Sequence, residues 1–234
     1  MNQYYECAND IMRSDKTVAV FCGGSLGKEV AGILLNETEK RIVFIDDVID
    51  TDKIMGCVRY SYRQFKEIFN SDETYVLIAT GEPFFRKKIR MMLQDDGYEL
   101  GSYVSCMSYI NRYARIGKGS MVFPNVYVAP YVMIDNNSII HANAQIEAEY
   151  VGDDCFISLG VFIGADTKVG AGSFVGPQAV LRDGLTIGEE CIVGMNSVVL
   201  NSVDINSVVA GNPAKVIRQN DAKRVFPQKL EDNI

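Results

Sequence analysis

Aliphatic residues recur at every sixth position through the second half of the chain. The series runs through Ile116, Val122, Val128, Ile134, Ile140, Ile146, Ile157, Ile163, Val169, Val175, Leu181, Ile187, Val193 and Val199. Neither the 3.6-residue period of a helix nor the two-residue period of a strand produces this spacing. A six-residue repeat is typical of a parallel β-helix, in which three repeats close one triangular coil. We therefore predict an all-β left-handed parallel β-helix over residues 111–218, in which the periodic side chains point inward and stack along the axis.

One step in this series is out of phase. Ile146 and Ile157 are eleven residues apart, where two regular repeats would give twelve. The spacing predicts an irregular corner around residues 148–151. Two interpretations are open: a deletion in a turn without functional consequence, and a pocket reshaped by the shorter turn.

Residues 1–110 have a different pattern, in which short apolar runs alternate with amphipathic stretches. Such alternation is typical of a Rossmann-like α/β domain with a parallel sheet, where ligands bind at the carboxyl ends of the strands. We expect strands over 17–22, 41–45 and 75–79, a glycine-rich turn over 23–27, and helices over 28–35 and 85–93. Residues 219–234 are polar and are expected to form a short helix or a loose tail.

The glycine-rich turn is a candidate phosphate-binding site. Gly23, Gly24, Ser25 and Gly27 join a strand to a helix, where backbone N–H groups can hold an anion, and the acidic pair Asp46 and Asp47 follows about twenty residues later. The alternative is a plain structural turn. The basic run Arg86, Lys87, Lys88 and Arg90 is predicted to be a solvated helix face, with pairing to a diphosphate as the alternative.

Charge and composition exclude several classes of protein. The net charge is −7 and neither half of the chain is basic, so a nucleic acid is not an expected partner. The cysteines have no C-x-x-C spacing and His141 is the only histidine, so no metal site is expected. No membrane partner is expected either. The first residues are polar and acidic, which is not typical of a signal peptide, so we predict a cytoplasmic protein.

The chain resembles a known group of enzymes in both halves. The stretch GVFIGADTKVGAGSFVGPQAVLRDGLTIGEECIVGMNSVV, followed by VVAGNPAKVIR, is similar to the hexapeptide-repeat acyltransferases. FCGGSLGKEVAGIL, FIDD and IATGEPFFRKKI resemble the branch that contains sialic acid O-acetyltransferases and bacterial UDP-amino-sugar N-acetyltransferases. The resemblance covers roughly residues 17–218.

The resemblance implies a homotrimer that uses acetyl-CoA as co-substrate and a nucleotide sugar as acceptor. A histidine supported by a carboxylate removes a proton from the sugar amine or hydroxyl, and a backbone N–H holds the oxyanion. The nucleotide would contact Gly23, Gly24, Ser25, Gly27, Asp46, Asp47, Thr80 and Gly81. Acetyl-CoA would contact Phe156, Ser158, Gly160, Gly164 and Lys215.

The chain departs from the family at its histidines. The family places its catalytic histidine after an acidic residue, and the corresponding residues here are Glu147 and Ala148. Two other family histidines correspond to Phe156 and Leu26. Because the repeat is one residue short, a second alignment places Glu147 itself at the position of the base, and both alignments are open.

The remaining candidate base is His141, where relatives often have an asparagine that lines the active site. Its side chain follows the inward Ile140 and should point out of the coil, to solvent or to a neighbouring subunit. It is a surface or interface residue, a substrate contact, or a relocated base with Glu147 or Glu149 nearby.

From these observations we expect an acetyltransferase that acts on a nucleotide-linked amino sugar in bacterial surface-glycan biosynthesis. N-acetylation is favoured over O-acetylation, with His141 and Glu147 as catalytic residues. The alternative is a non-catalytic β-helix trimer that binds a sugar nucleotide or CoA as a partner or regulatory subunit.

Overall fold

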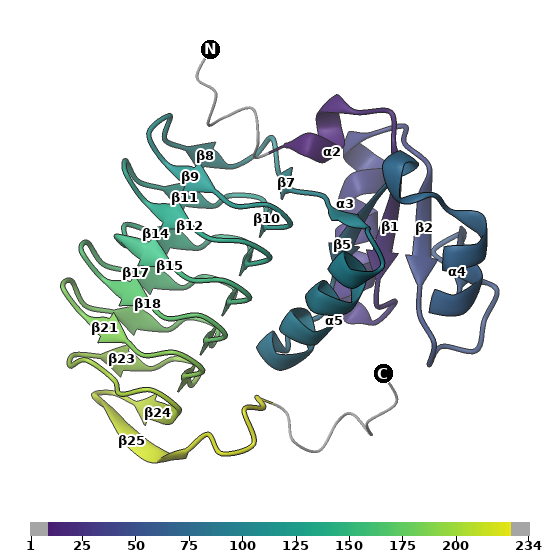
Figure 1. The fold of residues 1–234 in the computed structure, drawn as a ribbon. Helices are drawn as coiled ribbons and strands as arrows, with labels where there is room; N and C mark the ends of the chain where they lie inside the picture. Colours follow the sequence, from purple (N-terminus) through teal and green to yellow (C-terminus); the bar gives the residue numbers. More distant parts are fainter. Residues whose placement is uncertain (1–8, 226–234) are drawn as a thin grey trace.

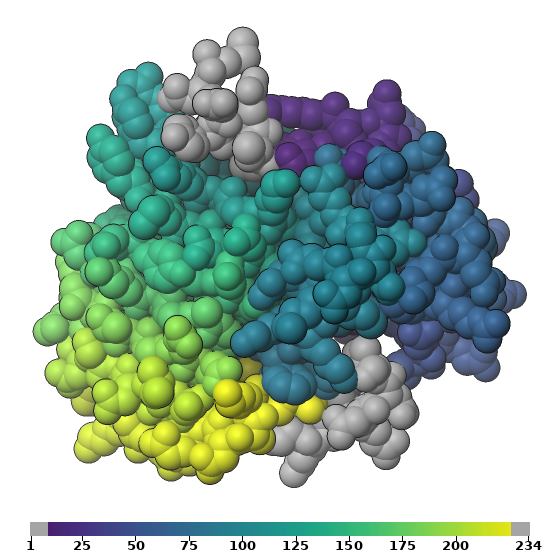
Figure 2. Space-filling view, viewed as in Figure 1, coloured from purple at the N-terminus to yellow at the C-terminus, as the bar shows by residue number. Residues whose placement is uncertain are grey.

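A computed structural model describes residues 9–225 of the chain, which form two parts (Figure 1). An α/β part comes first, and a stack of short parallel strands follows it. The two parts contact each other along their length, with helix α5 lying against the coils in the view of Figure 2. Over residues 9–225, every helix is too short or too polar to cross a membrane.

The α/β part is built on a six-stranded sheet in the order β3-β4-β2-β1-β5-β6. The pairs β1–β2, β1–β5, β2–β4 and β5–β6 are parallel, and β3 pairs antiparallel with β4. A parallel sheet of this kind was predicted from the alternation of strands and helices. The strands are β1 (Thr17–Phe21), β2 (Ile42–Ile45), β3 (Lys53–Ile54), β4 (Cys57–Tyr60), β5 (Thr74–Ile78) and β6 (Glu99–Leu100).

Helices cover both faces of this sheet. They are α2 (Asp10–Arg13), α3 (Ser25–Glu37), α4 (Tyr62–Ile68), the 3-10 turn η1 (Ser71–Glu73) and α5 (Pro83–Asp95). Val18 and Val20 of β1 pack with α3, while the alternate residues Ala19 and Phe21 share a cluster with residues of α4 and α5. Helix α3 begins at Ser25, inside the stretch expected to be a turn, so Gly27 is a helical residue.

The second part is a parallel β-helix of two-residue strands arranged in three sheets. We call them the domain-facing sheet (β7, β10, β13, β16, β19, β22, β24, β25), the second sheet (β8, β11, β14, β17, β20, β23) and the third sheet (β9, β12, β15, β18, β21). The domain-facing strands are Tyr103–Val104, Met121–Val122, Ile139–Ile140, Phe156–Ile157, Phe174–Val175, Ile192–Val193, Ser207–Gly211 and Ala214–Gln219. Those of the second sheet are Tyr109–Ile110, Tyr127–Val128, Gln145–Ile146, Phe162–Ile163, Val180–Leu181 and Val198–Val199. Those of the third sheet are Arg115–Ile116, Met133–Ile134, Tyr150–Val151, Lys168–Val169 and Thr186–Ile187.

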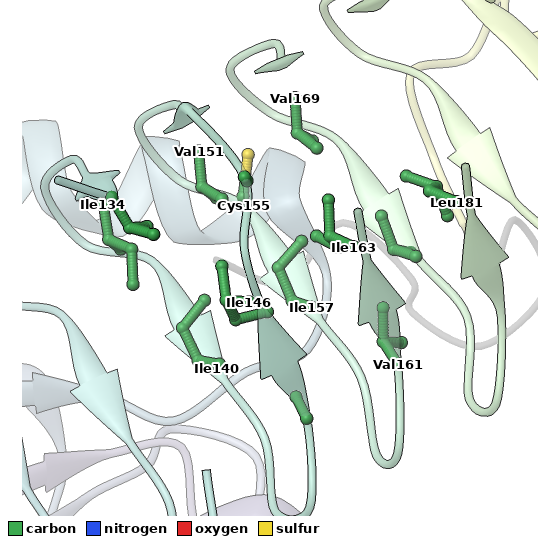
Figure 3. Packing of buried hydrophobic residues seen from close by; sticks show 14 of the residues in the cluster. Ile134, Ile140, Ile146, Val151, Cys155, Ile157, Val161, Ile163, Val169 and Leu181 are labelled. Atoms are coloured by element: carbon green, nitrogen blue, oxygen red, sulfur yellow. The ribbon is translucent and has the colours of Figure 1, made fainter. Parts of the chain in front are cut away.

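The inward stack of aliphatic side chains was predicted and is confirmed. All fourteen periodic residues belong to one buried cluster inside the coils, part of which Figure 3 shows. Regular coils pair residues 18 positions apart, as Val122 pairs with Ile140. The coils also begin ahead of residue 111, because β7 already pairs with β10.

The short repeat forms a compact turn between Ile146 and Val151. Val151 lies in register between Ile134 and Val169, so it is the inward residue that the irregular spacing concealed. Ala148 is 1% exposed and belongs to the interior cluster, whereas its neighbours Glu147 and Glu149 are exposed. The turn is one residue shorter than in a regular repeat, and the Ala148 side chain points into the core.

The outer side of the domain-facing sheet forms a second apolar surface. Its residues are buried together with α3 residues Val30, Ala31 and Leu34. They precede the inward residues of every third repeat: Tyr103, Met121, Ile139, Phe156, Phe174, Ile192 and Val208. Helix α3 is thus held between the α/β sheet and the β-helix, which joins the two parts through a common core.

Candidate functional site

A cavity lies at the carboxyl ends of β1, β2 and β5, the edge where parallel sheets bind ligands. Its volume is about 360 Å³, and its polar lining includes Asp46, Asp47 and Thr80. Six of the eight residues that the sequence analysis assigns to the nucleotide line it: Gly24, Ser25, Asp46, Asp47, Thr80 and Gly81. Gly23 and Gly27 do not, although they shape the turn beside it.

Gly27 has to be a glycine because the chain passes very close to it. A Cβ atom on Gly27 would lie 1.9 Å from the carbonyl oxygen of Cys22. This close approach brings the first turn of α3, which follows the N-cap residue Gly24, to the mouth of the cavity. The N–H groups of a first helical turn have no partners within the helix, so they favour a negatively charged ligand.

Asp46 holds the two loops that border the cavity. Its Oδ2 accepts a hydrogen bond from the N–H of Gly23 at 2.7 Å, and its Oδ1 accepts from Val48 and Ile49 at 2.9 and 2.7 Å. Asp47 accepts from the N–H of Tyr62, the first residue of α4, at 2.9 Å. Asp46 is therefore primarily a scaffold for the glycine turn, while Asp47 is exposed at the mouth.

Cys22 is a thiol in the wall of the cavity. Burial, reinforced by the nearby charge of Asp46, raises the pKa of Cys22 to about 12. The thiol therefore stays protonated at neutral pH, and a nucleophilic role for it has no support.

The cavity is connected to His141 through Phe156. Gly81 lines the cavity, and a Cβ atom on it would lie 3.4 Å from the ring of Phe156. The Phe156 and His141 rings are 6.0 Å apart between centroids. The predicted site residues of the two parts thus meet where the domain-facing sheet borders the cavity.

His141 lies between the two parts of the chain. The residue is 8% exposed, and its ring stacks on Phe123 with centroids 4.5 Å apart. Its Nε2 is 3.2 Å from Oε2 of Glu29 on α3. The side chain points out of the coil, as expected, but its neighbour is the α/β part of the same chain and not solvent or another subunit, because α3 covers the domain-facing sheet.

The other imidazole nitrogen has no partner. Nδ1 of His141 is buried and makes no hydrogen bond with any residue over 9–225. A buried unpaired polar atom costs about 1–3 kcal/mol. If Nε2 donates its hydrogen to Glu29, Nδ1 carries the lone pair of a neutral imidazole and can accept a proton.

Glu147 and Glu149 are not next to His141 within one chain. His141 lies at the corner between the domain-facing and second sheets, and Glu147 lies at the next corner, between the second and third sheets. Glu149 forms an exposed ion pair with Lys168 at 3.2 Å. The carboxylate beside His141 is Glu29, which the sequence analysis did not identify, because nothing in a helical sequence tells which distant strand it faces.

The residues expected to bind acetyl-CoA are distributed over several surfaces. Ser158 and Gly160 share the corner of His141, Gly164 shares that of Glu147, and Lys215 is exposed on β25. Phe156 is on the domain-facing sheet, stacked on Phe174 at 5.6 Å and only 7% exposed.

Two residues of the basic run are not solvated. Arg86 is 0% exposed, and Arg90 forms an ion pair with Asp154 at 2.6 Å. The prediction of a solvated helix face is therefore wrong for both, because this side of α5 faces the β-helix. Lys87 and Lys88 are exposed.

Comparisons with known proteins agree with this fold. A family model described as the GMPPB C-terminal domain matches residues 104–206. The chain is 26% identical over 184 residues to the bifunctional protein GlmU of Geotalea uraniireducens, a match that covers 78% of this chain and 38% of that protein. The chain thus spans less than two thirds of the length of this curated relative.

Several solved structures are similar over most of the chain. The acetyltransferase domain of PglB from Neisseria gonorrhoeae has a TM-score of 0.81 at 25% identity, covering 86% of this chain and 100% of that one. WeeI from Acinetobacter baumannii has a TM-score of 0.69 at 27% identity, covering 86% and 100%. PerB from Caulobacter crescentus, solved with CoA and GDP-perosamine, has a TM-score of 0.66 at 22% identity, covering 87% and 98%. At that identity the likeness to PerB concerns the fold alone.

Proposed function

We propose that this chain transfers an acetyl group from acetyl-CoA to the amino group of a nucleotide-linked sugar, in the cytoplasm and in bacterial surface-glycan biosynthesis. One observation carries the proposal: a cavity at the carboxyl ends of the parallel strands opens beside the sheet that bears His141. The similarity to the acetyltransferase domain of PglB supports the acetyl group as the cargo.

The cavity takes the nucleotide. Its apolar walls, which include Phe21, Ile45 and Phe85, suit a base, and the first turn of α3 offers N–H groups to the diphosphate. Thr80 and Gly81 form the edge nearest to Phe156, so the sugar leaves the cavity on the side of the β-helix.

The reaction is a single acyl transfer. The amine nitrogen attacks the thioester carbonyl carbon, a C–N bond forms, the C–S bond breaks and CoA leaves as the thiolate. Nδ1 of His141 accepts the proton that the amine loses and passes it to the thiolate, so that CoA is released as the thiol, while Glu29 holds Nε2. An amine with a pKa of about 8 is partly unprotonated at neutral pH, so it depends less on a strong base than a hydroxyl does.

A homotrimer brings the remaining predicted residues to the site. If the second sheet faces a three-fold axis, the corner with His141, Ser158 and Gly160 in one copy meets the corner with Glu147 and Gly164 in the next. Glu147 would then act across the subunit boundary, and acetyl-CoA would lie between the two corners.

The outer side of the second sheet supports this arrangement. Among its outward residues, Tyr109, Tyr127 and Val180 are 60%, 38% and 39% exposed. The Tyr109 and Tyr127 rings stack at 5.6 Å. An exposed stripe of large apolar side chains of this kind is typical of a protein interface.

The test is release of the CoA thiol from acetyl-CoA with a panel of amino sugars linked to UDP, GDP, CMP and dTDP. Release that depends on one of these acceptors, with a mass increase of one acetyl group on the sugar, supports the proposal. Binding of a nucleotide sugar without thiol release from any acyl-CoA contradicts it.

A non-catalytic binding protein is the second candidate. Neither residue that can align with the family histidine is a histidine, since they are Glu147 and the buried Ala148, and Nδ1 of His141 is closed off from solvent. Calorimetric binding of acetyl-CoA and nucleotide sugars, with no turnover, would favour this function.

A further inference from the structure

A buried arginine links the edge of the cavity to the β-helix. Nη1 of Arg86 donates hydrogen bonds to the carbonyl oxygens of Ile78 and Thr80, at 2.5 and 3.1 Å. Nε donates to the carbonyl oxygen of Asn137 at 2.9 Å, and Nη2 donates to the same carbonyl and to Oδ1 of Asn137 at 2.8 Å. One guanidinium group thus holds the end of β5 and a corner of the β-helix.

The corner is itself fixed by a second set of bonds. Nδ2 of Asn137 donates to the carbonyl oxygen of Arg86 at 3.2 Å and to Oδ1 of Asp154 at 2.7 Å. Nε and Nη2 of Arg90 contact the two carboxylate oxygens of Asp154 at 2.9 and 2.6 Å. Arg86, Asn137 and Asp154 are 0%, 0% and 2% exposed, so the centre of the network is shielded from water, while Arg90 is partly exposed at its outer end.

Stability alone is a weak reason for this arrangement. Burial lowers the pKa of Arg86 to about 10, even though Asp154 favours its charged form. Replacing buried charged groups by apolar ones is often neutral or stabilising, and the clearest use of such groups is to specify one arrangement.

The arrangement specified here is the position of the cavity relative to His141. Asn137 and His141 lie on either side of the same strand, β13 (Ile139–Ile140). Thr80, which Arg86 holds at the other side, lines the cavity beside Gly81. A displacement of about 1 Å at a reacting centre can reduce the rate a hundredfold.

We infer that Arg86 is a positioning residue, which holds the Thr80–Gly81 edge of the cavity at a fixed place relative to β13, the strand that precedes His141. The inference rests on the proposed function for its effect on acetyl transfer. Its effect on the backbone of the cavity edge does not depend on that function.

Asn137→Gly tests the side-chain bonds of this corner, because it removes those of Asn137 to Arg86 and Asp154 and leaves the bonds from Arg86 to the Asn137 carbonyl oxygen in place. Gly119 and Gly172 occupy the same corner in other coils with φ of +73° and +66°, and Asn137 has a φ of +52°, so glycine is compatible with the backbone. The matched control is Asn196→Gly, an exposed corner residue with a φ of +54°. Arg86→Lys is the second variant, because it keeps the buried charge but loses the two-sided guanidinium contact.

Hydrogen exchange, calorimetry with UDP and GDP, and kinetics are measured on the full chain. We expect Asn137→Gly and Arg86→Lys to speed amide exchange over residues 80–82 at least about tenfold. We also expect weaker binding of the nucleotide and a kcat reduced about 10- to 100-fold, with an unchanged KM for acetyl-CoA, while Asn196→Gly changes none of these.

Unchanged exchange and unchanged kcat in the folded variants would overturn the inference, as would equal effects in Asn196→Gly. If the wild-type chain neither binds nucleotides nor transfers acetyl groups, the proposed function fails. In that case the inference about Arg86 is judged from amide exchange alone, by comparing residues 80–82 in the variants with the same residues in the wild-type chain. If Asn137→Gly does not fold, Arg86→Lys gives the same three measurements.

Discussion

Nε2 of His141, on the β-helix, lies 3.2 Å from Oε2 of Glu29, on a helix of the α/β part. The contact spans 112 positions in the sequence and joins helix α3 to the coils. It brings a histidine and a carboxylate together, whereas positions 147 and 148, which align with the acid and the histidine of the acyltransferases that the sequence resembles, are Glu and Ala. The interface between the two parts, rather than one corner of the coil, therefore holds the candidate base.

Substitution of His141 by Ala should reduce acetyl transfer by about a hundredfold or more, the usual range for loss of a general base. Glu29→Gln should have a smaller effect, about tenfold, because it removes the charge that orients the ring and not the base itself. The measurement is kcat from thiol release. Glu149→Gln, which loses only an exposed ion pair with Lys168, is the control. Activity of His141→Ala equal to wild type would remove His141 from the mechanism.

Glu147→Gln tests the subunit-boundary role of Glu147. If this carboxylate meets the neighbouring copy's site, kcat should fall about tenfold or more while the trimer stays intact. Light scattering and thiol release on the same sample separate the two effects. Normal turnover in an intact trimer would leave His141 and Glu29 as the complete candidate machinery.

Tyr127→Glu should convert the proposed trimer to monomers and abolish transfer. The substitution places a charge on the apolar stripe of the second sheet, where burial against another copy would strip it of water. Met133→Glu is the matched control, because Met133 is 39% exposed and Tyr127 38%, but Met133 faces outward from the third sheet. Size-exclusion chromatography with light scattering gives the masses. A trimer that survives Tyr127→Glu and dissociates with Met133→Glu would mean that the third sheet forms the interface.

Gly27→Ala should destabilise the protein by about 1–3 kcal/mol, the usual cost of overpacking. The added methyl group would collide with the carbonyl oxygen of Cys22. Relief of this collision would move the first turn of α3 away from the cavity, so nucleotide binding should also weaken. Gly32→Ala in the same helix meets only the end of Met55 at 3.4 Å and should be neutral or stabilising by up to about 1 kcal/mol. Thermal unfolding and calorimetry measure both effects. Equal stability of the two variants would contradict the tight turn.

Cys22 should react slowly with iodoacetamide at pH 8. Burial and the charge of Asp46 raise the pKa of its thiol to about 12, so the thiolate fraction at pH 8 is roughly a thousandfold below that of an ordinary cysteine. The rate should still rise about tenfold per pH unit above pH 9, where an ordinary thiol is already ionised. Peptide mapping with the exposed Cys106 as internal reference gives the ratio. A Cys22 rate close to that of Cys106 at pH 8 would show that the cavity wall is open to water.

The six-residue spacing predicted the β-helix because an inward side chain has to recur once per strand. The stack continues across the short repeat, where Val151 is the inward residue five positions after Ile146 instead of six. The acidic pair and the glycine turn predicted the edge of the sheet at which the cavity lies. The left hand of the coil is a prediction from the same spacing.

The sequence contains a second periodicity. Large apolar residues precede the inward residue in every third repeat, as Met121, Ile139, Phe156 and Phe174 do. Two apolar residues in a row on a two-residue strand mean that both faces of that sheet are covered. The second sheet has a similar run in Tyr127, Phe162 and Val180, so the signal indicates that two sheets are covered and does not tell which of them faces the first domain.

Local periodicity and strand order were enough to predict the two architectures, the inward residues of the coils and the edge of the sheet at which the cavity lies. The partners of the charged residues depend instead on how the two parts pack together. Glu29, Arg86 and Arg90 look like ordinary exposed helix residues, and each is engaged because α3 and α5 are packed on the β-helix. A long charged side chain contacts the surface against which its helix packs. That packing depends on the fit of two complete surfaces, and no local sequence pattern specifies it.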